Sequence, residues 1–185
     1  MPITALLLAL AILALLGYGL GRSRSLAVVK GSIRHLHSLP SYHGAYVALW
    51  CGVPALAVAL AWLIAEPHII ERLVVGAMPA EFRDLSPDRL GTVVNEVKNL
   101  AAGYVAREPE PALRAAAEQY VSLRATGFAA MAVVSLAVAI LGIVIGRRHV
   151  APGLKARNRV ERVMSLALML GSTVAIFTTI GIVLS

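Results

Sequence analysis

The chain alternates between long apolar stretches and polar connecting segments. Four stretches contain no Asp, Glu, Lys, Arg or His, and they cover residues 3–20, 46–65, 126–146 and 163–184. About 20 apolar residues in an α-helix cross a hydrocarbon core roughly 30 Å thick, so each stretch predicts a transmembrane helix. The first stretch does not resemble a secretory signal, because no basic residue precedes it and Arg22 and Arg24 follow it.

The polar segments differ in their charge. Segment 21–45 carries four basic residues and no acid, segment 147–162 carries six basic residues and one acid, and segment 66–125 mixes seven basic with nine acidic residues. Basic residues in short loops stay in the cytoplasm. We therefore expect the first two segments inside the cell, and segment 66–125 and both termini outside. The net charge of +7 then reflects topology rather than a nucleic-acid partner.

Segment 66–125 is the only sizeable part outside the apolar stretches. Ser86 and Pro87 are typical of a helix start, and apolar residues recur at helical spacing after them. The sequence REPEP at 107–111 is expected to end this helix, and a second helix then leads toward the third apolar stretch. A shorter amphipathic helix is expected at 68–78, near the bilayer surface. About 60 residues with modest apolar stripes cannot bury a large core alone, so we expect a membrane, subunit or partner to cover them.

These patterns predict an all-α integral membrane protein with four transmembrane helices and an external helical hairpin between the second and the third. Region 1–65 holds the first two helices and a cytoplasmic loop. Region 66–125 is the external helical segment. Region 126–185 holds the last two helices and the second basic loop.

Small and hydroxyl residues within the spans bear on helix packing. Gly17 and Gly21 have the spacing that lets membrane helices approach closely, as do Gly142 and Gly146. Because glycine is common in membrane helices, we do not assign the first pair to a contact. A small-residue face is expected to pack in the second span, and in the fourth span hydroxyls favour a packed helix over a polar pathway. The residues are Ala48, Gly52, Ala55 and Ala59 in the second span, and Ser172, Thr173, Thr178 and Thr179 in the fourth.

A histidine-rich segment, RHLHSLPSYHG at 34–44, separates the first two spans. His35 and His37 could ligate one metal together only on an extended strand, and no carboxylate or cysteine lies nearby to complete the ligands with His43. A metal site is therefore not favoured. We expect an interfacial re-entry in which four side chains dip into the headgroups: Leu36, Leu39, Tyr42 and Tyr46.

Several kinds of chemistry have no pattern in the sequence. No span holds an ionisable residue that could relay protons or sense voltage. The chain has no GxxxxGK[ST] motif for ATP, and its single cysteine, Cys51, forms no metal cluster. The external acids are interleaved with arginines, as on a solvated helical face. We therefore assign no catalytic, cofactor-binding or metal residue and expect no enzyme activity.

Two stretches carry a family resemblance. Residues 36–56 read LHSLPSYHGAYVALWCGVPAL, and residues 156–185 read ARNRVERVMSLALMLGSTVAIFTTIGIVLS. The first resembles the N-terminal extension of certain bacterial phosphate ABC-transporter permeases, the PstC-type subunit. The second resembles the basic stretch and first helix that open the permease body in that family. The resemblance implies phosphate import across the bacterial inner membrane, with a second permease subunit, a nucleotide-binding ATPase and a periplasmic phosphate-binding protein as partners.

The resemblance also limits what is expected of this chain. In the family, the permease body with its cytoplasmic coupling helix follows the fourth span, whereas this sequence ends at Ser185. We therefore expect a fragment or a separately encoded piece that anchors, assembles or regulates the transport complex and cannot transport alone. The alternative hypothesis is a small inner-membrane sensor or scaffold whose periplasmic hairpin binds a partner.

Overall fold

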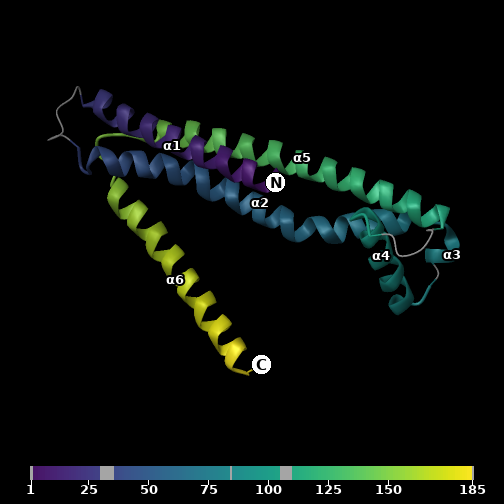
Figure 1. Ribbon diagram of the computed structural model, residues 1–185. Helices are drawn as coiled ribbons and strands as arrows, with labels where there is room; N and C mark the ends of the chain where they lie inside the picture. Colours follow the sequence, from purple (N-terminus) through teal and green to yellow (C-terminus); the bar gives the residue numbers. More distant parts are fainter. Residues whose placement is uncertain (1, 30–35, 84, 105–109, 185) are drawn as a thin grey trace. The chain divides into compact units, whose positions relative to one another are not determined.

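Helices form all the regular secondary structure in the described part of the chain. The computed structural model describes residues 2–29, 36–83, 85–104 and 110–184 (Figure 1). Six helices follow one another there: α1 (Pro2–Val28), α2 (Pro40–Ala77), α3 (Ala80–Arg83), α4 (Pro87–Ala101), α5 (Pro111–Arg148) and α6 (Ala156–Leu184).

Four of these helices, α1, α2, α5 and α6, are long and apolar enough to cross a membrane. The prediction of an all-α, multi-pass membrane protein with four such helices is therefore confirmed. Each helix extends past its uncharged stretch, and α2 and α5 have 38 residues each. At 1.5 Å per residue a helix of that length is about 57 Å long, nearly twice the thickness of a hydrocarbon core.

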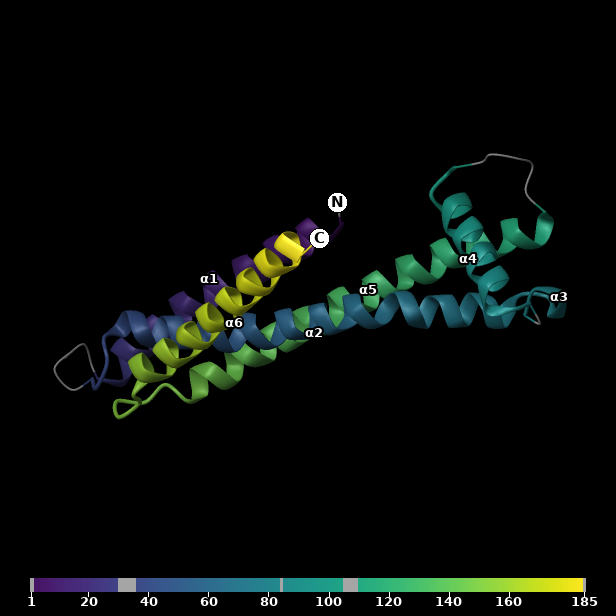
Figure 2. The ribbon, with the colours of Figure 1, turned by 90° about the horizontal axis from the view of Figure 1, so that it is seen from below.

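The chain divides into two compact units, of which the first comprises Met1–Ala55 and Leu136–Ser185. In this unit α1, the start of α2 and the end of α5 lie side by side (Figures 1 and 2). Glycines make the approach possible. A Cβ atom on Gly142 would collide with the carbonyl oxygen of Trp50, and one on Gly21 would lie 2.7 Å from that of His43. Gly44 of α2 is equally close to α1, since its Cβ would lie 2.7 Å from the oxygen of Tyr18.

These contacts correct two packing expectations. Our decision not to assign the Gly17 pair to a contact was wrong, because Gly17 faces Ile143 and Gly21 faces α2. The expected small-residue face of α2 was half right. Ala55 and Ala59 are buried, but a Cβ on Gly52 would meet nothing within 4 Å. The buried stripe begins one position earlier on the helix, with Val47 and Cys51, both 0% exposed.

The second unit, Leu56–Ser135, has a hydrophobic core of its own. The later part of α2, the residue after it, α4 and the first turns of α5 supply seven buried residues: Ile70, Val74, Met78, Val97, Leu113, Ala116 and Ala117. Lys98 of α4 forms an ion pair with Glu71 of α2 beside this core. The second unit thus covers part of its apolar surface by itself, which the sequence analysis did not expect.

Four further expectations for residues 66–125 can be compared with the structure. The predicted helix after Ser86 is present as α4, and the next helix runs into the third apolar stretch as α5. The separate amphipathic helix at 68–78 is wrong, because residues 66–77 continue α2 without interruption. The position of the break was also wrong: α4 ends at Ala101, before REPEP. Gly103 follows with a φ of 87°, the left-handed conformation found just after many helices.

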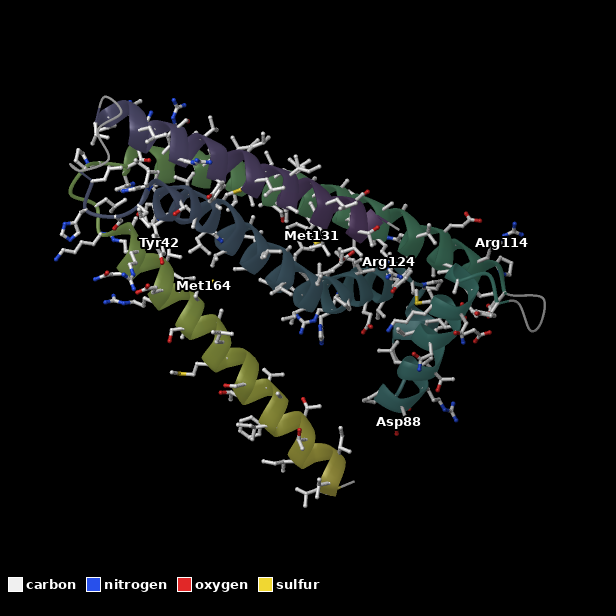
Figure 3. All side chains as sticks on the ribbon, turned by 60° about the vertical axis from the view of Figure 1, so that its left-hand side comes forward. Tyr42, Asp88, Arg114, Arg124, Met131 and Met164 are labelled. Carbon is white, nitrogen blue, oxygen red and sulfur yellow. The ribbon has the colours of Figure 1, made fainter. Side chains whose placement is uncertain are left out.

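The helix α6 packs on its own unit only through its first turns. Ala156 and Val160 are buried, whereas every residue from Met164 to Leu184 is exposed. Side chains project outward from α6, and the labelled Met164 is one of them (Figure 3). The expected packed helix is therefore not found along most of α6. Its hydroxyls bond back to their own helix, Thr173 to Met169 O and Thr179 to Ala175 O at 2.8 and 2.9 Å.

Candidate functional site

Polar and aromatic side chains gather where α2, the end of α5 and the start of α6 meet within the first unit. We call this group the basic junction and define it by Tyr46, Trp50, His149, Arg159 and Arg162. Tyr46 and Trp50 are four residues apart, so they lie on one face of α2. Arg159 and Arg162 are three residues apart and share a face of α6 for the same reason. His149 directly follows α5, which ends at Arg148.

Four members of the basic junction form a continuous series of contacts: Arg159, Tyr46, Trp50 and His149. Arg159 Nη1–H donates to Tyr46 Oη at 3.2 Å, and its guanidinium carbon lies 5.8 Å from the centre of the Tyr46 ring. Tyr46 meets Trp50 edge-on with ring centres 6.3 Å apart, and Trp50 stacks on His149 at 6.2 Å with nearly parallel rings. His149 Nδ1–H in turn donates to Ile145 O at 2.8 Å. The series holds Arg159 in a defined place above α2.

A groove of about 430 Å³ opens beside these contacts. Its walls are mainly apolar, and Arg159 and Arg162 supply its cationic side chains. The lining residues are Tyr46, Leu49, Trp50, Val53, Pro54, Arg159, Arg162 and Val163. The arrangement combines an apolar slot with two positive charges in its lining, which suits a molecule with an anionic group and a hydrocarbon part.

The histidine-rich segment ties the two basic loops together. His37 N–H donates to Pro152 O at 3.1 Å, and Ser38 Oγ accepts a hydrogen bond from the backbone N–H of Arg157 at 3.3 Å. Arg157 lies in the first turn of α6, where backbone N–H groups lack partners within the helix. Ser38 therefore satisfies the start of α6 from another part of the chain.

The expectation that Tyr46 dips into the headgroups as part of an interfacial re-entry was wrong. Residues from Pro40 onward belong to α2, and the Tyr46 side chain is only 4% exposed beneath Arg159. His43 is fully buried in the packing of α2. His35 lies outside the described residues. Among the described residues, no group of three His, Cys, Asp or Glu side chains could hold a metal ion.

The sequence analysis missed the basic junction, although part of its signal was present. It used the arginines of 147–162 only for topology. An aromatic pair four residues apart at the end of a span, followed by an arginine-rich connector, is the pattern that could have drawn attention to it. The stacking of His149 on Trp50 has no sequence signal, because it depends on how α5 packs on α2.

Comparison with known proteins identifies a family. Residues 7–178 match the model of a family described as "Phosphate ATP-binding cassette transporter". No curated protein matches the chain, and no solved structure matches it.

Proposed function

Because this chain belongs to the phosphate ATP-binding cassette transporter family, we propose that it is the N-terminal membrane region of a phosphate importer permease. Its role in this proposal is to anchor, assemble or regulate the transport complex. The family match over residues 7–178 is the observation that carries the proposal. The partners are a second permease subunit, a nucleotide-binding ATPase and a periplasmic phosphate-binding protein.

The charge distribution supports one orientation in the bacterial inner membrane. The basic loops at 21–45 and 147–162 lie in the cytoplasm, and region 66–125 lies in the periplasm together with both termini. Regions 1–65 and 126–185 then form the membrane part. The lengths of α2 and α5 agree with this division, since both helices continue beyond their uncharged stretches toward region 66–125.

Residues 1–185 do not transport phosphate by themselves in this proposal. The apolar stretches of the four long helices hold no ionisable residue, and the exposed surface of α6 has no described helix of this chain along it. The α6 helix is instead the surface on which the remainder of the permease packs. The chain has no enzyme activity of its own, and ATP hydrolysis belongs to the partner ATPase.

Co-purification of the ATPase tests the proposal. The full-length protein that contains this chain is tagged and extracted in mild detergent, and the bound nucleotide-binding ATPase is quantified. We expect stoichiometric recovery, because a permease and its ATPase form a stable complex. Absence of the ATPase from these preparations would overturn the assignment.

Substitutions at two glycines, one test and one control, show whether α6 is the surface on which the complex assembles. For both Gly171 of α6 and Gly19 of α1, an added Cβ would have no atom of a described residue within 4 Å apart from the neighbouring backbone of its own helix. We expect Gly171→Leu to reduce recovery of the complex, because the larger side chain obstructs a partner that packs on α6. Gly19→Leu serves as the control and leaves recovery unchanged. Equal recovery from both variants would remove α6 as the assembly surface at this position.

A second candidate is a membrane sensor or scaffold, and the independent core of the second unit favours it. A small unit with its own core and a charged exterior can bind a partner without any transport function. In that case, the full-length protein would cross-link to a periplasmic protein through region 66–125 and yield no ATPase. The same purification therefore distinguishes the two candidates.

A further inference from the structure

We propose that the groove at the basic junction binds an anionic phospholipid, with the lipid phosphate at Arg159 and Arg162 and part of one acyl chain along α2. This inference concerns a binding site that transport of phosphate does not require. It holds whether the chain assembles with a permease or acts as a scaffold.

No described residue neutralises the charges of Arg159 and Arg162 at the groove. Glu161 is the single acid of the 147–162 connector, and it pairs with Arg157 at 2.6 Å. No ion pair among the described residues involves Arg159 or Arg162. A guanidinium has five N–H donors, and the bond from Arg159 to Tyr46 uses one of them. The remaining donors are free to meet the oxygens of a phosphate group, which arginine recognises with two parallel hydrogen bonds.

The rest of the groove suits a hydrocarbon chain. Leu49, Val53, Pro54 and Val163 supply aliphatic wall, and Val53 is 47% exposed. These residues lie in or beside the apolar stretches of α2 and α6, two helices that are long and apolar enough to cross a membrane, so we expect the groove to open to the bilayer. Tyr46 and Trp50 line the same groove, where Tyr46 contacts both the Trp50 ring and Arg159.

Charge complementarity selects a lipid from among the possible occupants. A second helix would leave two unpaired guanidinium groups against its apolar surface, and a zwitterionic lipid would bring its own cation to them. A free phosphate ion would leave the apolar wall unused. An anionic lipid matches both parts, and basic pockets between transmembrane helices are known to hold such headgroups.

Quenching of Trp50 fluorescence by brominated lipids tests the proposal directly. The chain contains two tryptophans, and Trp62→Phe leaves Trp50, which lines the groove, as the reporter. The full chain with this substitution is reconstituted with brominated phosphatidylglycerol or brominated phosphatidylcholine, mixed with unbrominated phosphatidylcholine. We expect stronger quenching by phosphatidylglycerol at equal content, from which a relative binding constant follows.

Matched arginine variants separate a built site from general surface charge. Arg159→Gln and Arg162→Gln are each expected to lower the relative binding constant roughly 5-fold, the effect of one basic residue near an anionic lipid. Arg22→Gln with Arg24→Gln removes two charges from α1, away from the groove, and is expected to leave the preference intact. Arg159→Lys with Arg162→Lys keeps the charge but loses the two parallel hydrogen bonds of the guanidinium, and is expected to retain more of the preference than the glutamine variants, which excludes misfolding as the cause.

Three results would overturn the proposal. Equal quenching of Trp50 by the two brominated lipids would show that the groove does not select charge. Equal losses in the α1 and α6 variants would show a general surface effect. Displacement of brominated phosphatidylglycerol by millimolar inorganic phosphate would show a site for the free ion instead of the lipid.

Discussion

At the scale of single residues, glycines decide how closely the helices of the first unit approach. Gly142 lies against the backbone of Trp50, and a Cβ there would collide with its carbonyl oxygen. Gly52 of α2 has no atom within 4 Å of an added Cβ and gives a matched control. We expect Gly142→Ala to lower the free energy of unfolding by about 1–3 kcal/mol, because backbone must shift. Unfolding in mixed detergent micelles, followed by circular dichroism, measures the loss. A stability equal to that of Gly52→Ala would contradict the close contact.

Ser38 is a second residue whose single contact has a measurable effect. Its hydroxyl accepts from the N–H of Arg157 in the first turn of α6. We expect Ser38→Ala to destabilise that turn by about 0.5–2 kcal/mol, as loss of a helix cap does. Faster amide hydrogen exchange at residues 156–159 reports the change. Ser23→Ala removes a hydroxyl bonded within its own helix and is expected to leave exchange in α6 unchanged; equal effects would exclude the cap.

At the scale of helices, apolar patterning predicted the elements better than their contacts. An uncharged stretch of about 20 residues has few alternatives to a membrane helix, so the four spans and the run of α5 out of segment 66–125 were predictable. The continuation of α2 through residues 66–77 was not. Pro67 and the change to charged residues there are typical of a helix end, but the core formed by Ile70 and Val74 with α4 and α5 favours a continuous helix.

The same reasoning explains the misplaced face of α2. Size alone favoured Ala48 and Gly52 as contacts, whereas Val47 and Cys51 are the buried residues. Neighbouring helices decide which face of a uniformly apolar helix is covered. Because lipid is as apolar as protein, the covered and the lipid-facing residues do not differ in hydrophobicity, and the sequence shows no periodic pattern that distinguishes them. The basic junction was missed for the same reason.

The core of the second unit can be tested through one of its leucines. Leu113 of α5 is 6% exposed within this core, while Leu73 of α2 is 51% exposed. We expect Leu113→Ala to lower the free energy of unfolding of this unit by roughly 2–5 kcal/mol, the cost of a cavity at a buried leucine. Leu73→Ala should change it by less than about 0.5 kcal/mol. Hydrogen exchange in α4 follows the loss. Equal effects of the two substitutions would mean that the unit has no core of its own.

At the scale of the whole molecule, orientation links the family to the structure. The proposed permease needs the basic connector before α6 in the cytoplasm, where the ATPase lies, and region 66–125 in the periplasm. His43 would be an unsuitable reporter of sidedness, because its side chain is fully buried. Asn158 and Asp88 are exposed, in the basic connector and in α4 respectively. Neither is a lysine or arginine, so replacing them leaves the basic residues that set topology unchanged.

Cysteine labelling at these two positions tests the orientation. Cys51 is the only cysteine and is buried, so Cys51→Ser provides the background. In intact cells with a permeable outer membrane, a membrane-impermeant maleimide is expected to label Asp88→Cys. Asn158→Cys should react only after the inner membrane is opened, because six basic residues hold its loop in the cytoplasm. The reverse pattern would place the basic connector on the side of the membrane away from the ATPase and would overturn the permease proposal. The proposed lipid site would still stand, because its arginines need only a lipid headgroup, and both sides of the membrane have headgroups.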